Sequence, residues 1–194
     1  MDPVTQLALA GSLAWASGIR LYAVLFLAGV LGRSGQLVLP LHLEVLQHPL
    51  VLGVTGFMLL VEFMADKLPV LDSAWDAIQG FIRIPAGIVL AAATLGEMDP
   101  VWVAIAAILG GTIASTAFAA KAGGRALINA SPEPASNWIA SFAEDLAVPA
   151  ALWLAISQPL VFLGLLLGFL VLAFWLLAKL RRGLRLLFRR QRSA

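Results

Sequence analysis

Paired acidic residues inside or beside apolar stretches are the side chains of this chain best suited to chemistry. Glu62 and Asp66 lie in the segment Glu-Phe-Met-Ala-Asp-Lys-Leu-Pro, and Glu144 and Asp145 lie in Phe-Ala-Glu-Asp-Leu-Ala-Val-Pro. An ionisable residue inside a membrane span costs about 2.5 to 3.5 kcal/mol or more, so it indicates an ion, proton or substrate path. Two close carboxylates disfavour simultaneous ionisation and can hold a proton or a cation. We therefore predict that these four carboxylates bind the ion or proton.

A buried base accompanies the carboxylates. Arg20 lies in Ala-Ser-Gly-Ile-Arg, well inside the first apolar segment, where it needs a carboxylate partner such as Glu62 or the Glu144-Asp145 pair. We predict that Arg20 is a counter-ion or gate. A salt bridge that only fixes helix packing and a site for an anionic headgroup are the alternatives. Ser17-Gly18 could let the helix unwind beside Arg20.

A second polar stripe follows the first acidic pair. If residues 71–83 are helical, their polar side chains share one face. Lys67 is a further candidate. Asp66 and Lys67 could also pair with each other at the membrane interface, with the Lys67 side chain snorkelling towards the water. The secondary candidates are thus Lys67, Asp72, Asp76, Gln79 and Arg83, and the expected helix breaks are Pro69 and Pro149.

The composition defines the class of protein. The chain has 194 residues, of which 61% are hydrophobic and 12% charged, and its mean hydropathy is +0.93. Too few charges are present for the shell of a soluble domain, so we predict an integral membrane protein. The absence of Cys excludes Cys-ligated metal sites and thiol catalysis. We expect no cofactor and no enzyme, although paired carboxylates leave an intramembrane aspartyl dyad open, and a metal site stays undecided.

Runs of about 20 apolar residues predict an all-α fold. The third of the expected helices is ambiguous, because residues 71–96 form either one span or a surface helix followed by a short span. Pro149 is expected to kink or interrupt the fifth. The six expected helices are residues 4–32, 49–67, 71–96, 100–121, 136–157 and 160–180.

The distribution of Lys and Arg predicts the orientation. The C-terminal residues 181–194 form a basic, amphipathic tail, which is typical of the cytoplasmic side and of contact with anionic lipids. With six spans, both termini would be cytoplasmic, in a multi-pass protein of the bacterial inner membrane. We expect no nucleic-acid partner, because the basic cluster adjoins a membrane span.

A short repeat suggests a duplication. Met-Asp-Pro-Val at residues 1–4 recurs at residues 98–101, an offset of 97 residues. Three helices in each copy would make residues 1–97 and 98–180 two inverted repeats, an architecture in which broken helices meet at a midplane site. Such a small unit is expected to form a homodimer.

These motifs resemble a known family. Ala-Ser-Gly-Ile-Arg at 16–20, Glu62-Phe-x-Ala-Asp-Lys-x-Pro69 and Glu144-Asp145 with Pro149 are similar to small multi-pass membrane proteins of bacteria and plants that share a domain of unknown function. The resemblance covers most of residues 10–175 and implies a helical inner-membrane protein without a transferable activity. The layout also resembles cation–proton exchangers with two inverted Glu-x-Gly-Asp motifs, but here Ala65 replaces the Gly and the spacing is one residue longer.

Three functions are consistent with the sequence. The first is a compact secondary transporter that moves a cation or small polar solute, coupled to protons through the carboxylates. The second is lipid handling, with Arg20 and Arg83 binding a phosphate headgroup. The third is a non-transporting assembly or scaffold protein in which all the charges are paired.

Overall fold

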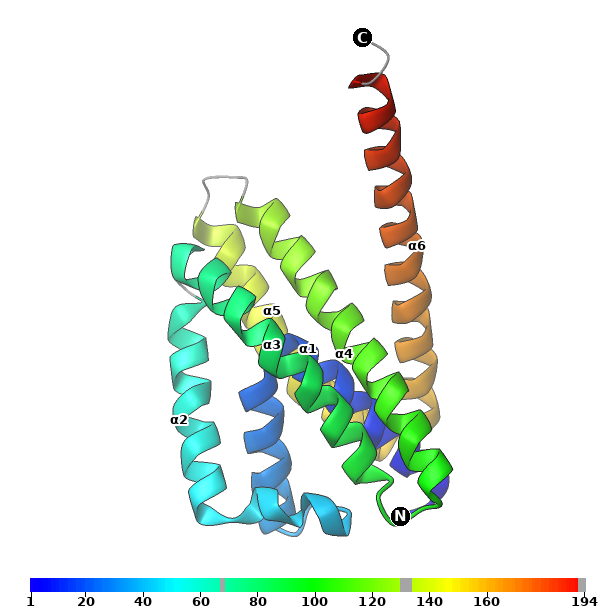
Figure 1. Ribbon diagram of the computed structural model, residues 1–194. Helices are drawn as coiled ribbons and strands as arrows, with labels where there is room; N and C mark the ends of the chain where they lie inside the picture. The colour runs from blue at the N-terminus through cyan, green and yellow to red at the C-terminus, as the bar shows by residue number, and fades with distance from the viewer. Residues whose placement is uncertain (67–68, 130–133, 192–194) are drawn as a thin grey trace.

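The computed structural model describes residues 1–66, 69–129 and 134–191, and within these ranges it does not describe the side chains of residues 69–74, 129, 134–135, 137 and 180–191. The described residues form only helices and their connections, which confirms the predicted all-α class (Figure 1). The elements are α1 (Pro3–Arg33), η1 (Leu41–Gln47), α2 (Pro49–Ala65), α3 (Pro69–Thr94), α4 (Pro100–Asn129), α5 (Pro134–Ser157) and α6 (Pro159–Gln191).

Every α-helix starts with a proline. Proline suits the first helical position, because its fixed φ is helical and its missing N–H would have no partner there. Asp2 accepts hydrogen bonds from the N–H groups of Val4 and Thr5 at 3.1 and 3.0 Å. Asp99 caps α4 in the same way, at 2.8 Å from Val101 N. The repeated Met-Asp-Pro-Val segments are thus two helix starts of one kind.

The lengths of the helices fit a multi-pass membrane protein. Five helical segments are long and apolar enough to cross a membrane, and η1 and α2, bent by 69°, pass the same test together. α3 is one helix through Pro85, and α5 is one helix through Pro149. Pro149 therefore does not end α5, and the open choice for residues 71–96 is decided in favour of one helix with its candidate span at Trp75–Thr94.

The helix break lies in α1 instead. Arg20 has φ −146° and ψ 87°, which is extended backbone inside an otherwise helical segment. Before the break, α1 runs parallel to α4, because Leu7 and Trp102 line one cavity and Gly18 packs on Ala114. After the break, Gly29 packs on Leu52 of α2.

The second half of α1 runs antiparallel to α2, since Phe26 packs on Gly56 and Arg20 pairs with Asp66. α2 and α4 start at the same end of the bundle, because Gly96 next to α4 contacts His42 of η1. α1 is consequently a helical hairpin that turns at Arg20 and returns, and Figure 1 shows its two blue halves meeting near the middle of the bundle.

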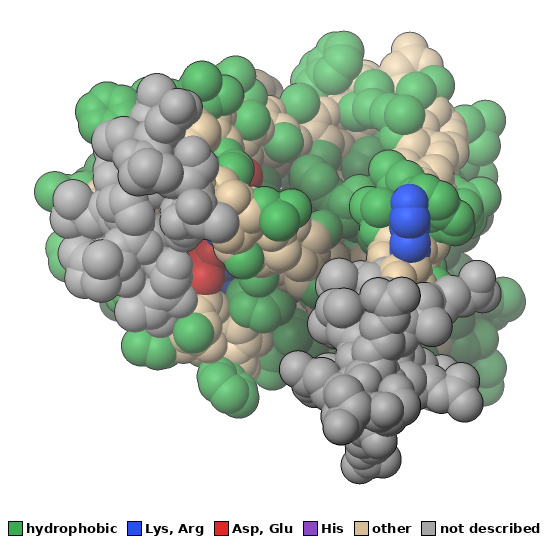
Figure 2. All heavy atoms as spheres, turned by 90° about the horizontal axis from the view of Figure 1, so that it is seen from above, with side chains coloured by type: hydrophobic (Ala, Val, Ile, Leu, Met, Phe, Trp, Pro, Cys, Tyr) green, Lys and Arg blue, Asp and Glu red, His purple; other side chains and the backbone are tan. Residues whose placement is uncertain are grey.

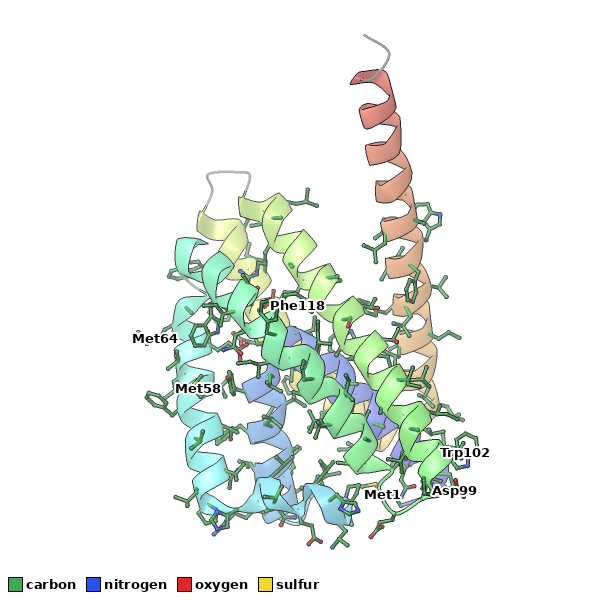
Figure 3. All side chains as sticks on the ribbon, viewed as in Figure 1. Met1, Met58, Met64, Asp99, Trp102 and Phe118 are labelled. Atoms are coloured by element: carbon green, nitrogen blue, oxygen red, sulfur yellow. The ribbon has the colours of Figure 1, made fainter. Side chains whose placement is uncertain are left out.

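This course bears on the expected topology of six crossings with both termini on one side. Five helical segments pass the test for a crossing, or six with the bent pair of η1 and α2, and Figure 1 shows α1 beginning at one end of the bundle and α6 ending at the other. Met1 and Asp99 lie at the same end (Figure 3). The division of the chain into two inverted repeats stays a prediction.

Small residues form the seam between α1, α3 and α4. A Cβ at Gly18 would meet the carbonyl oxygen of Ala114 and lie 2.8 Å from Ala117 Cβ. A Cβ at Gly87 of α3 would likewise meet Ala114 Cβ of α4, and a Cβ at Gly110 of α4 would lie 2.5 Å from Ala91 Cβ of α3. Such contacts let the backbones approach closely, which is a common basis of helix association in membranes.

We predict that Gly18→Val destabilises the protein by about 1 to 3 kcal/mol, because the added atoms overpack this seam. Gly164→Val is the matched control, since nothing lies within 4 Å of a Cβ built at Gly164. Thermal unfolding of the purified protein in detergent measures both. An equal loss of stability in the two variants would contradict the close α1–α4 packing.

Candidate functional site

Nine charged side chains of the described residues meet where the α1 hairpin turns, and we call them the charged cluster. They come from all five helices α1 to α5 or, for Asp66, from the residue that caps α2. Four lie within candidate spans of α4 and α5, so the cluster lies at the depth of the apolar helices. Its members are the bases Arg20, Arg83, Lys121 and Arg125 and the carboxylates Glu62, Asp66, Asp76, Glu144 and Asp145.

Arg20 links α1 to α2 and α5. Its guanidinium pairs with Asp66 and lies 3.1 Å from Asp145 Oδ1 and 3.7 Å from Glu144 Oε2. It also donates to the hydroxyl and the carbonyl oxygen of Ser141, at 2.9 and 3.2 Å. Arg20 is completely buried, and a buried charge is tolerated only when it is paired and hydrogen-bonded.

Arg83 links α3 to α2. It donates to Glu62 and lies 2.7 Å from Asp76, which is two helical turns earlier on the same face of α3. Arg83 and Glu62 are both fully buried. Asp76 is thereby shared between Arg83 and Lys121, whose Nζ lies at 3.1 Å.

Lys121 connects the two arginine centres. Its Nζ lies 3.3 Å from Glu144 Oε2 and 4.0 Å from Asp66 Oδ1. It also donates to the carbonyl oxygen of Ile19 at 3.2 Å, immediately before the break in α1. Carbonyl groups at a helix end have no partner within the helix, so Lys121 satisfies a group that the break has freed.

Arg125, one turn further along α4, completes the cluster. Its Nε and Nη2 donate to the two carboxylate oxygens of Glu144 at 3.0 and 3.1 Å. This two-point geometry is the strongest form of an arginine–carboxylate contact. Arg125 also lies 3.9 Å from Asp66, so Glu144 and Asp66 each have three bases within 4 Å.

Among the described residues, the cluster holds more acid than base. Its four bases and five carboxylates give 4 − 5 = −1 when all are ionised. Some buried atoms also have no hydrogen-bond partner among the residues that the structure describes, namely Glu62 Oε2, Gln79 Oε1 and Arg83 Nε. Buried polar groups of this kind point to a function or to exchangeable partners such as water.

The cluster reaches the surface at one edge. The side chains of Glu144 and Asp145 are 16% and 23% exposed, whereas those of Arg20, Glu62 and Asp66 are completely buried. Figure 2 looks onto the end of the bundle where the C-terminus lies and shows acidic atoms at that surface. The cluster is therefore deep in the bundle but accessible at one side.

Two apolar cavities lie elsewhere, on either side of α6. One, of about 300 Å³, lies between Trp15 and Phe169, whose rings meet edge to face at 6.0 Å. The other, of about 250 Å³, lies around Leu7 and Trp102. Apolar residues and glycine line both, so neither offers a polar ligand a partner.

The structure brings together most of the residues predicted from the sequence. All five primary candidates belong to the cluster, and so do Asp76 and Arg83 of the secondary set. Gln79 is buried on the adjoining turn of α3. Lys67 and the side chains of Pro69 and Asp72 lie outside what the structure describes.

Sequence reasoning missed three participants, Lys121, Arg125 and Ser141. The signal for the two bases is their spacing of four residues at one end of α4, which places them on one helix face. Ser141 carried no signal, because its role depends on the bend of α1. Among the described residues, no three His, Asp or Glu side chains are grouped to hold a metal.

We predict that Arg20→Gln destabilises the protein by about 3 to 5 kcal/mol, because it removes the buried base that Asp66, Glu144 and Asp145 share. Arg33→Gln removes the same charge from an exposed position and should change stability by no more than about 0.5 kcal/mol. Adding Asp66→Asn to Arg20→Gln should restore part of the loss. Thermal unfolding in detergent measures all three, and an Arg20 variant as stable as the Arg33 variant would contradict the central place of Arg20.

The comparisons with known proteins identify the family of this chain. No curated protein and no solved structure matches the chain. The family described as a domain of unknown function (DUF4126) matches residues 7–179, which include the whole charged cluster. The chain therefore belongs to the DUF4126 family.

Proposed function

We propose that this protein is a small secondary transporter that couples a cation or small polar solute to protons through the charged cluster. The observation that carries the proposal is the excess of one carboxylate, counted over the described residues, in a buried cluster inside the apolar bundle. A net negative charge in such a place is costly. Binding one proton or one monovalent cation neutralises it.

A proton fits the cluster better than a metal ion. The carboxylates are interleaved with bases, and among the described residues none of their groupings could hold a metal. Closely spaced carboxylates relieve their repulsion by sharing a proton. A proton needs one oxygen rather than a coordination shell, so it can enter without displacing the bases.

Glu62 is the carboxylate that holds this proton. Arg83 is the base that it contacts, and Arg83 is shared with Asp76. Asp66 and Glu144, in contrast, each have three bases within 4 Å. Glu62 is also fully buried with one oxygen that lacks a hydrogen-bond partner.

The two alternative functions have less support. Lipid handling would use Arg20 and Arg83 for a phosphate headgroup, but both are completely buried and engaged by carboxylates of the protein. A scaffold would need every charge to be paired, and each of the five carboxylates does lie within 4 Å of a base. The excess of carboxylates over bases among the described residues, and the buried polar atoms without a hydrogen-bond partner there, favour the transporter over the scaffold.

The orientation in the membrane follows from the basic residues. Arg125 and the basic C-terminal tail belong to the end of the bundle opposite Met1, where cytoplasmic loops are expected. We place this end in the cytoplasm and the N-terminus on the outer side of a bacterial inner membrane. The tail would contact anionic lipids, and a homodimer remains a prediction.

The test is reconstitution in liposomes with an enclosed pH-sensitive dye. Adding mono- and divalent cations to the wild type should produce a cation-dependent proton flux, which Glu62→Gln abolishes. Glu44→Gln, the same change at an exposed position of η1, should keep it. No flux with any cation would reject the transporter and favour the scaffold.

Stability separates the proton site from its neighbours. Since Gln mimics a protonated glutamate, we predict that Glu62→Gln unfolds within about 1 kcal/mol of the wild type, whereas Asp66→Asn loses about 3 kcal/mol or more, because it removes a carboxylate charge that three bases share. Thermal unfolding at neutral pH measures both variants. A larger loss for Glu62→Gln than for Asp66→Asn would show that Glu62 is the ionised partner.

A further inference from the structure

The charged cluster has different surroundings on its two sides. Towards the end of the bundle with the C-terminus, Glu144 and Asp145 are partly exposed. Towards the other end, α5 continues with Val148 and Leu152, which are 0% and 1% exposed. The same helix therefore changes from accessible carboxylates to a sealed apolar core within two turns.

α1 shows the same change on both arms of its hairpin. Leu13, about two turns before Arg20, and Val24, about one turn after it, are completely buried in the core that contains Val148. Gly18 packs on α4 so closely that no side chain fits between them. The turn of α1 and the apolar residues next to it thus close the bundle between the cluster and the N-terminal end.

The break in α1 also needs polar surroundings. Non-helical backbone at membrane depth is tolerated where protein or a water-filled cavity satisfies its polar groups. Lys121 provides a partner for the carbonyl of Ile19. The buried atoms of Glu62, Gln79 and Arg83 without hydrogen-bond partners among the described residues lie on the neighbouring helices α2 and α3. Water that enters beside Asp145 would satisfy such groups.

We infer that the charged cluster is the floor of a water-filled vestibule that opens at the C-terminal end alone, and that the turn of α1 is its barrier. This inference rests on the cluster that the proposed function uses and adds the route to it. A proton or small polar cation enters past Asp145 and Glu144 and stops at Arg20. Release on the other side requires movement of the α1 hairpin against α4 and α5.

Cysteine accessibility tests the vestibule directly, because the chain contains no Cys. Single cysteines at Asp145 and Ser17 are reacted with a membrane-impermeant maleimide in right-side-out and inside-out vesicles. Gln36→Cys marks the N-terminal end, and Gly123→Cys marks the C-terminal end, where nothing lies within 4 Å of a Cβ. Glu144→Cys is a second probe of the vestibule if Asp145→Cys fails to fold.

The expected result is that the Asp145 or Glu144 probe reacts only in the vesicles in which Gly123→Cys reacts. Ser17→Cys, fully buried beyond the turn, should react at least about tenfold more slowly from either side, since the core excludes water. A vestibule probe that reacts from both sides, from the Gln36 side, or not at all overturns the inference. So does a Ser17 probe that reacts as fast as the Asp145 probe.

Labelling does not depend on transport, so the two proposals fail separately. One-sided labelling of Asp145→Cys together with no proton flux in the liposomes would retain the vestibule and reject the transporter. Proton flux together with labelling from both sides would retain the transporter and reject the turn of α1 as the barrier.

Discussion

The burial of Arg20 is the constraint on which the rest of the structure depends. A guanidinium in an apolar bundle must be paired and hydrogen-bonded to be tolerated. Arg20 obtains carboxylates from α2 and α5 and a serine from α5. These helices must therefore pack around one point, and α3 and α4 are connected to the same point through Asp76 and Lys121.

The break in α1 is the structural counterpart of this pairing. A continuous helix of 31 residues would cross the membrane, but extended backbone at Arg20 turns the chain back. The turn frees carbonyl groups, and Lys121 binds one of them. The same base also pairs with Glu144 and Asp76. One side chain therefore binds both a free backbone carbonyl and two buried carboxylates.

The sequence predicted local features better than the direction of the chain. Prolines and capping aspartates marked the helix starts within a few residues, and membrane carboxylates near Arg20 marked the cluster. The return of α1 was not predictable, because an apolar run of sufficient length is compatible with a crossing or with a hairpin. The four-residue repeat marks two helix starts, because Asp followed by Pro is a favourable way to begin a helix, and the duplication it suggests stays a prediction.

The sharing of partners explains how such a cluster could respond to a proton. Each of Arg20, Lys121 and Arg125 contacts more than one carboxylate. If one carboxylate becomes neutral, its base still has another acidic partner, so no base is left without a carboxylate. The cost of changing the proton content is therefore spread over the cluster instead of falling on one pair. In an isolated buried ion pair the two groups have no second partner, so removing the charge of one leaves the other buried and unpaired. A shared cluster next to a broken helix can thus change its pairing without unfolding the bundle, and movement of the α1 turn requires such a change.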